Sequence, residues 1–120
     1  MATWVDVEEL AGRLPGAEPV VAHDGSPAWG AGRHTFARLR YADGGDELVH
    51  VWTDVMDTEQ ALADRRETFV RIDTFRFRVT LWARLGLLDR RELAELLLES
   101  YDVRGGPRRR GGTGLADLLR

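Results

Sequence analysis

The sequence predicts an α+β fold, with helices packed on one face of an antiparallel sheet. Apolar residues recur with helical spacing near both ends of the chain. Between these stretches, apolar and polar residues alternate as they do in strands, and Gly-rich turns separate several of the segments. The 120 residues suffice for a single compact domain. The expected order is helix, three-stranded meander, helix, one or two strands, and a long helix.

The first helix is expected to run from Trp4 to Leu14. Thr3 stands at the N-cap position and is followed by apolar residues with helical spacing. Pro15, followed by glycine, ends the helix because proline cannot continue the hydrogen-bond ladder. Residues 17–27 are expected to form a loop, with a short extended piece at Val20 to His23.

Three strands of a meander are expected at residues 28–31, 34–41 and 47–55. An Asp-Gly turn at residues 43–46 connects the last two. In the third strand both faces are partly apolar, which indicates a central position in the sheet.

A second helix is expected to begin at Asp57 or Thr58, and a short turn to continue through Phe69. Phe75 to Ala83 is the clearest strand, because apolar residues alternate strictly with polar ones and Trp82.

The long helix should begin after a cap at Asp89 and continue to about Val103. Residues 1–104 then form the domain. Residues 105–120 hold a basic Gly-rich loop and a short terminal helix capped by Thr113, packing on or trailing the same domain.

Composition bounds the classes of function. The chain has no Cys, which leaves no disulfide, thiolate metal site or Cys nucleophile. Its N-terminus is acidic where a signal peptide would be basic, and no stretch is apolar enough for a membrane span, so a cytoplasmic protein without membrane contact is expected. The net charge is -3, with 13 of the 17 basic residues in the second half. All 17 are Arg, a bias typical of genomic base composition.

No cofactor, metal or catalytic residue is predicted. His23, His34 and His50 have no spacing that preforms a metal site. Ser26 lies near His23 and Asp24, but triads draw their members from separate segments, so an Asp-Gly-Ser turn is favoured. An enzyme would need a pocket that unites a His with carboxylates from distant segments.

Arginines near aromatic residues are the remaining candidates for a site. Arg38 and Arg40 would share a face of the hairpin, and Arg76 and Arg78 a face of the clearest strand. Three more, Arg108, Arg109 and Arg110, follow the long helix. If the strands are neighbours, four of these guanidinium groups could contact phosphates together. Trp29, Trp52 and Trp82 are candidate stacking surfaces. The alternative is an ordinary solvated sheet face.

Several motifs resemble the MmcQ/YjbR family. They are T-W-V-D-V with L-P-G after the first helix, G-S-P-A-W followed by G-R-H-T-F-A-R-L, then R-E-T-F, V-T-L-W-A-R-L, and E-L-A-E-L-L-L-E-S-Y before a basic run. They cover roughly Thr3 to Arg110, and P-A-W followed by T-F-A is the most specific part. The resemblance implies a compact α+β fold and DNA binding through a double-wing arrangement of hairpins.

These observations predict a small, non-enzymatic, YjbR-like protein that binds DNA weakly and without sequence preference, as a monomer or weak homodimer. Arg38, Arg40, Arg76 and Arg78 would contact the phosphate backbone, and Arg108 to Arg110 would add a mobile clamp. The alternative is a protein-interaction or homodimerisation module with no nucleic-acid role.

Overall fold

The computed structural model describes residues 1–70, 80–105 and 107–120, without the side chains of residues 55–58, 107 and 108. The helices are α1 (Trp4–Ala11), α2 (Val55–Asp64), α3 (Arg90–Gly105) and α4 (Leu115–Leu118), with short 3-10 turns η1 (Leu85–Leu87) and η2 (Pro107–Arg110). The strands are β1 (Ala17–Val21), β2 (Pro27–Ala31), β3 (His34–Tyr41), β4 (Glu47–Trp52), β5 (Phe69–Val70) and β6 (Thr80–Arg84).

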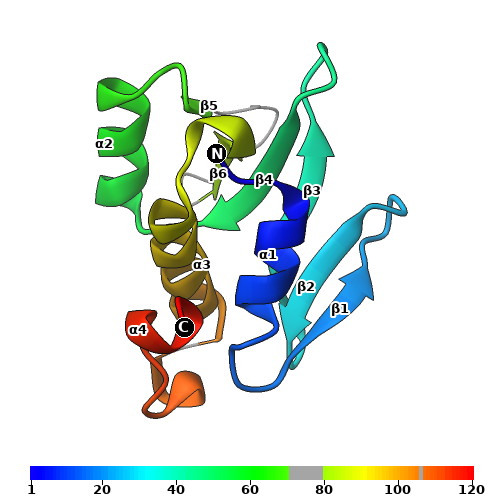
Figure 1. Ribbon diagram of the computed structural model, residues 1–120, viewed down its shortest axis with the longest axis vertical. Coiled ribbons are helices and arrows are strands. Elements are labelled where there is room, and N and C mark those ends of the chain that lie inside the picture. Colours follow the sequence, from blue (N-terminus) through cyan, green and yellow to red (C-terminus); the bar gives the residue numbers. More distant parts are fainter. Residues whose placement is uncertain (71–79, 106) are drawn as a thin grey trace.

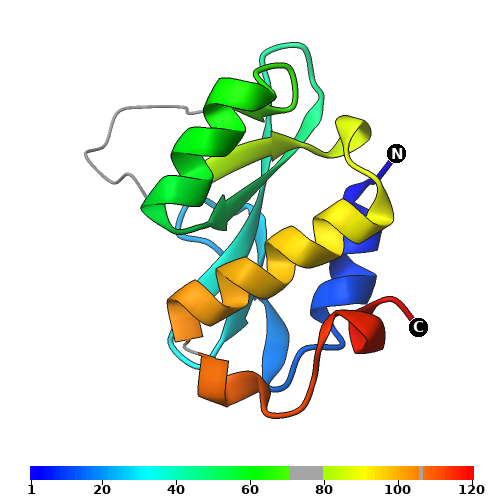
Figure 2. The ribbon, with the colours of Figure 1, turned by 90° about the vertical axis from the view of Figure 1, so that its left-hand side faces the viewer.

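The six strands form one antiparallel sheet in the order β1-β2-β3-β4-β6-β5. Helices α1 and α3 pack together on one side of this sheet (Figures 1 and 2). The predicted α+β class is therefore confirmed, and β4 is central, between β3 and β6, as predicted. No helix within the described ranges is long and apolar enough to cross a membrane.

Strand β1 is the main error of the sequence-based prediction, which made residues 17–27 a loop with only a short extended piece at Val20 to His23. All five residues of Ala17–Val21 pair with β2. The reversal between the two strands is closed by hydrogen bonds from Ala22 N–H to Ser26 O (2.9 Å) and from Gly25 N–H to Ala22 O (2.8 Å). Gly25 has φ 87°, a conformation that glycine adopts without the steric cost of a side chain. Strand β1 has an alternation too weak to predict because it lies at the sheet edge and is largely exposed.

Several helices and strands begin or end at other residues than predicted. The first helix ends at Ala11 rather than Leu14, with Gly12 at its C-cap, and β4 ends at Trp52 rather than residue 55. Helix α2 begins at Val55, before the predicted cap. Of the predicted strand from Phe75 to Ala83, residues 75–79 lie outside the described residues, and the observed strand continues to Arg84.

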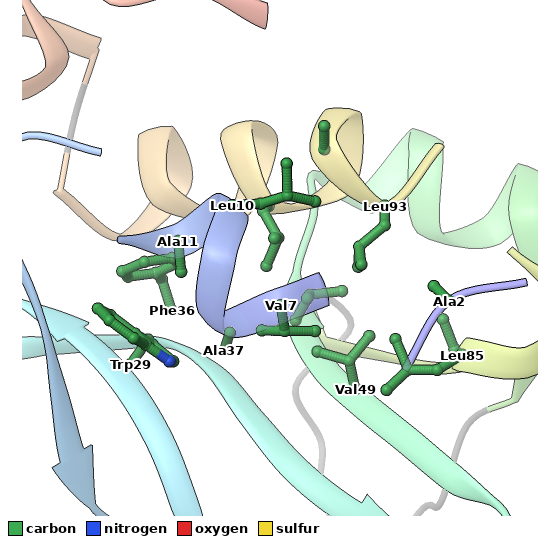
Figure 3. Packing of buried hydrophobic residues seen from close by; sticks show 14 of the residues in the cluster. Ala2, Val7, Leu10, Ala11, Trp29, Phe36, Ala37, Val49, Leu85 and Leu93 are labelled. Atoms are coloured by element: carbon green, nitrogen blue, oxygen red, sulfur yellow. The ribbon is translucent and has the colours of Figure 1, made fainter. Parts of the chain in front are cut away.

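The core lies between the sheet and the helices. Figure 3 shows Val7 and Leu10 of α1 and Leu93 of α3 packing toward Ala37 of β3 and Val49 of β4. All five side chains are fully removed from solvent. Burial of such apolar groups drives folding by roughly 25 cal/mol per Å². Both helices are therefore fixed on this side of the sheet.

A β-bulge in β3 adjusts the sheet to this core. Across one step of β2, from Trp29 to Gly30, the register on β3 moves from Ala37 to Thr35. Phe36 is the extra residue, and both it and Ala37 are buried in the core cluster. The ring of Phe36 meets that of Tyr101 edge to face, with centroids 5.5 Å apart. After the bulge, β3 alternates regularly.

The C-terminal residues are folded against the domain. Leu118 of α4 is fully buried, and its carbonyl accepts a hydrogen bond from the guanidinium of Arg13. The short helix is capped by the Asp117 carboxylate, which accepts the N–H of Gly114 (2.9 Å). Gly114, and not Thr113, is therefore the N-cap.

Candidate functional site

One side of the sheet faces away from α1 and α3. Alternate residues of the three central strands belong to the main core cluster, namely Ala37, Leu39, Val49, Val51, Leu81 and Ala83. The intervening side chains point the opposite way, because successive side chains of a strand alternate between faces. They are Arg38, Arg40, Leu48, His50, Trp52, Thr80, Trp82 and Arg84, and we call the surface they form the outer face.

Three arginines lie close together on the outer face. Arg40 is the register partner of Leu48 in β4, and Leu48 is in turn the partner of Arg84 in β6. Neighbouring strands are about 4.8 Å apart, so the backbones of Arg40 and Arg84 are about 10 Å apart. Arg38 lies two residues from Arg40 on the same face, beside His50. The three arginine side chains are therefore attached to the backbone within one small area of the sheet.

Two carboxylates from the hairpin turns accompany these arginines. Asp24 Oδ2 lies 2.9 Å from Arg40 Nη1 and 3.9 Å from Arg38 Nη2. Asp46 Oδ2 lies 3.8 Å from Arg84 Nη1. The carboxylate of Asp46 is well exposed, so its attraction for Arg84 is weakened by water. The best-formed ion pair on the outer face is therefore Asp24 with Arg40.

Asp24 is held in place by its own turn. Its Oδ1 accepts hydrogen bonds from the N–H of Ser26 (3.0 Å) and from the Ser26 hydroxyl. These two bonds, with a smaller contribution from Arg38 and Arg40, lower the pKa of the Asp24 carboxyl to about 2. The side chain is therefore fully ionised at neutral pH. The Asp-Gly-Ser turn preferred over a catalytic triad in the sequence is the arrangement found.

Aromatic rings stack beside the arginines. The His50 ring is parallel to that of Trp82 (2°), with centroids 4.2 Å apart, and lies 4.4 Å from the ring of Trp52 at 30°. Arg104 of α3 extends this group, since its guanidinium lies 4.6 Å over the Trp52 ring and its Nε donates to Thr35 O (2.9 Å). The stack thus links β6, β4 and α3.

His50 is buried among these groups, with 8 % of its surface exposed. Burial, followed by the positive charges of Arg38, Arg40 and Arg104, lowers its pKa from 6.5 to about 3. The imidazole is therefore neutral at pH 7. Neither ring nitrogen has a hydrogen-bond partner within the described residues, and the same holds for Trp82 Nε1 and Arg38 Nε.

The three predicted stacking surfaces are not equivalent. Trp29 belongs to the main core cluster on the helix side of the sheet, so it does not lie on the outer face. Trp82 does, but only 7 % of its surface is exposed. Trp52 is half-buried, with Arg104 over its ring. The aromatic rings of the outer face are therefore mostly covered, and they pack against the neighbouring side chains rather than forming an open stacking surface.

The remaining predicted arginines lie elsewhere or outside the described part of the chain. Arg76 and Arg78 fall within residues 71–79 and are outside the described residues, as is the side chain of Arg108. Arg110 Nε is 2.9 Å from Asp102 Oδ1, and its Nη1 donates to Thr113 O (3.3 Å). It is anchored within the C-terminal segment.

Arg109 packs over the β2–β3 turn. A Cβ added at Gly32 would collide with its guanidinium group, and one added at Gly105 would approach its Nε to 2.9 Å. Gly32 precedes Arg38 by six residues, which corresponds to about 20 Å along an extended strand. The side chains of Arg109 and Arg110 therefore lie apart from the outer face.

Sequence reasoning missed two members of the site. Arg84 was omitted because the predicted strand ended one residue too early, although its even spacing from Trp82 places both on the same face. Asp24 was assigned to a turn, but its approach to Arg40 depends on the hairpin of β1 and β2, and of β1 only a short extended piece from Val20 was predicted. Within residues 1–70, 80–105 and 107–120, no three His, Asp or Glu residues are grouped as metal ligands would be.

Comparison with known proteins supports the fold. A crystal structure of a Deinococcus radiodurans protein, DR2400, with a DUF419 domain, is similar to this chain with a TM-score of 0.74. The match covers 98 % of this chain and 86 % of that one, at 16 % sequence identity. No family model and no curated protein matches the sequence. The chain is thus a compact α+β domain of the kind seen in an uncharacterised family.

Proposed function

We propose that this chain is a non-enzymatic, YjbR-like protein that binds duplex DNA weakly through phosphate contacts from the outer face. The observation that supports this most is the grouping of Arg38, Arg40 and Arg84 on the outer face, on the two strands that flank β4. Planar guanidinium groups suit phosphate oxygens because they can donate two parallel hydrogen bonds. The fold shared with a DUF419 domain is consistent with the motif resemblance.

The contacts favour backbone binding over base recognition. The described part of the outer face lies on strands that fix the starting points of the arginines, while its aromatic rings are largely covered. Single strands are usually bound by open aromatic platforms, whereas phosphates of a duplex need only positive charge. With few contacts, binding is expected in the micromolar range or weaker at physiological salt.

Replacement of Arg40 should weaken DNA binding. We expect Arg40→Gln to lower the affinity for a mixed-sequence duplex about three- to tenfold at low salt, and to reduce the slope of log K against log salt by about one, because one phosphate contact is lost. Fluorescence anisotropy at several salt concentrations measures both quantities. Arg91→Gln is the matched control, because Arg91 is exposed on α3 and pairs with Glu95 at 3.2 Å. Equal effects of the two variants would reject the outer face as the binding surface.

The alternative of homodimerisation by sheet extension is disfavoured at the β1 edge. Ala22 N–H bonds to Ser26 O, so alternation along the β1–β2 register directs the N–H groups of Val20 and Glu18 toward β2. The nitrogen of Pro19 then faces the free edge. Proline has no N–H to donate, and proline at such a position is a common protection against edge-to-edge pairing.

Restoring the missing donor should promote self-association. We expect Pro19→Val to increase the dimer fraction at a given concentration several-fold, as measured by sedimentation velocity, because β1 then offers an uninterrupted edge. Glu18→Val is the control, since it adds a similar apolar side chain without adding an N–H at the edge. If both variants associate equally, apolar surface and not the edge donor is responsible.

A further inference from the structure

The carboxylate of Asp24 occupies the position in which an external oxyanion would contact the outer face. Its Oδ2 lies 2.9 Å from Arg40 Nη1 and 3.9 Å from Arg38 Nη2. Carboxylate and phosphate oxygens bind guanidinium groups with the same type of charge-assisted hydrogen bond. One oxygen of this turn therefore engages the two cations that the proposed function assigns to a phosphate.

The position of this carboxylate follows from the β1–β2 hairpin. The β2–β3 register pairs Ala28 with Arg38, and continued by two residues it places Ser26 opposite Arg40. Asp24, two residues before Ser26, is bound to Ser26 through both the N–H and the hydroxyl, while its other oxygen is directed to Arg40. The turn thus delivers one carboxylate oxygen to the end of β3.

We infer that Asp24 is an intramolecular competitor for the phosphate site of Arg38 and Arg40, and that a nucleic-acid phosphate displaces its carboxylate on binding. This inference rests on the proposed function and adds a regulatory contact to the same site. The displacement requires no rearrangement of the sheet, since Asp24 lies in an exposed turn. Its carboxyl has a pKa of about 2, so the competitor stays charged throughout the physiological pH range.

The turn can be kept while the competing charge is removed. In Asp24→Asn the side-chain oxygen still accepts the hydrogen bonds from Ser26, because Asn and Asp form the same type of turn. Asp43→Asn is the matched control: Asp43 lies in the exposed turn between β3 and β4, the change in net charge is the same, and Asp43 makes no ion pair among the described residues. Thermal denaturation should give similar midpoints for all three proteins.

Two probes test the inference. With a mixed-sequence 20-base-pair duplex at low salt, Asp24→Asn should bind about fivefold more tightly than Asp43→Asn, with a salt dependence steeper by about one in the log–log slope. With inorganic pyrophosphate, the NMR signals of the Nε–H groups of Arg38 and Arg40 should shift at a lower ligand concentration in Asp24→Asn than in Asp43→Asn.

The outcomes separate the inference from the proposed function. If the wild type binds DNA and the two variants bind alike, Asp24 is not a competitor and the proposed function stands. If neither the wild type nor Asp24→Asn binds DNA at low salt, the proposed function fails. The pyrophosphate titration then decides the inference, which is overturned if the arginine signals respond equally in both variants.

Discussion

Acidification from pH 7 to about pH 4.5 is expected to destabilise the protein by about 2 to 3 kcal/mol through His50. In the folded chain its pKa is about 3, against 6.5 in the unfolded chain, so the unfolded state binds the additional proton between these values. Each pH unit in that window costs about 1.4 kcal/mol. Above about pH 6.5 the imidazole is neutral in both states and stability does not depend on it. Between pH 6.5 and 3 the unfolded state is favoured increasingly as the pH falls.

Urea denaturation at a series of pH values measures this loss, and the His50→Phe variant should lack it. Phe preserves an aromatic ring beside Trp82 and removes two nitrogens that have no partner within the described residues, so the variant should be at least as stable as the wild type at pH 7. His34→Gln, at an exposed position, is the control. The carboxyls of Asp6 and Asp24 have lowered pKa values, so the stability that they contribute is lost only below about pH 4 and does not overlap the window of His50 above that pH. An NMR titration that finds His50 protonated near pH 6.5 would contradict the prediction.

Replacement of Ser100 by Ala is expected to destabilise the fold by about 2 to 3 kcal/mol. The Ser100 hydroxyl is fully buried in α3, accepts the N–H of Trp52 (2.9 Å) and donates to the carbonyl of Phe36. One side chain therefore joins α3 to both β3 and β4. Alanine leaves a backbone donor and a backbone acceptor without this partner, which is the costly way to lose a hydrogen bond.

The same denaturation measurement checks this prediction. Val103→Ala on the exposed side of α3 is the matched control, because Val103 is 43 % exposed and its truncation should change stability by less than about 0.5 kcal/mol. An effect of Ser100→Ala no larger than that of Val103→Ala would mean that the hydroxyl does not connect the helix to the sheet in solution.

Strong local patterns in the sequence predicted much of the fold. Residues 34–41 lie between two Gly-containing turns, and the leucines from Leu93 onward repeat with the helical period, so these elements were placed correctly or within two residues. Strand β1 was missed because it is held by pairing with β2 alone and its own residues are mostly exposed. A strand that forms mainly because a neighbouring strand pairs with it has little apolar alternation of its own, so it is hard to predict from its residues.

The candidate site was predictable only in part for a related reason. That Arg38 and Arg40 share a face follows from strand periodicity, as does the shared face of His50 with Leu48. The pairing of Arg40 with Asp24 joins residues 16 positions apart through a hairpin that the sequence did not reveal. The depressed pKa of His50 likewise depends on which strands become neighbours, and this was not readable from composition or spacing.

The single extra residue in β3 determines which amino acids the outer face displays. Without the bulge, strict alternation would place Phe36 on the same face as Arg38 and Arg40, and the arginines could not stay outside while that ring remained in the core. The composition of the outer face therefore depends on the number of residues in the β2–β3 hairpin as well as on their types. A one-residue deletion between Gly32 and Phe36 would remove the bulge, and Phe36 could then not stay in the core while the arginines stay on the outer face. Homologous sequences should therefore be compared for the length of this hairpin before their arginines are compared.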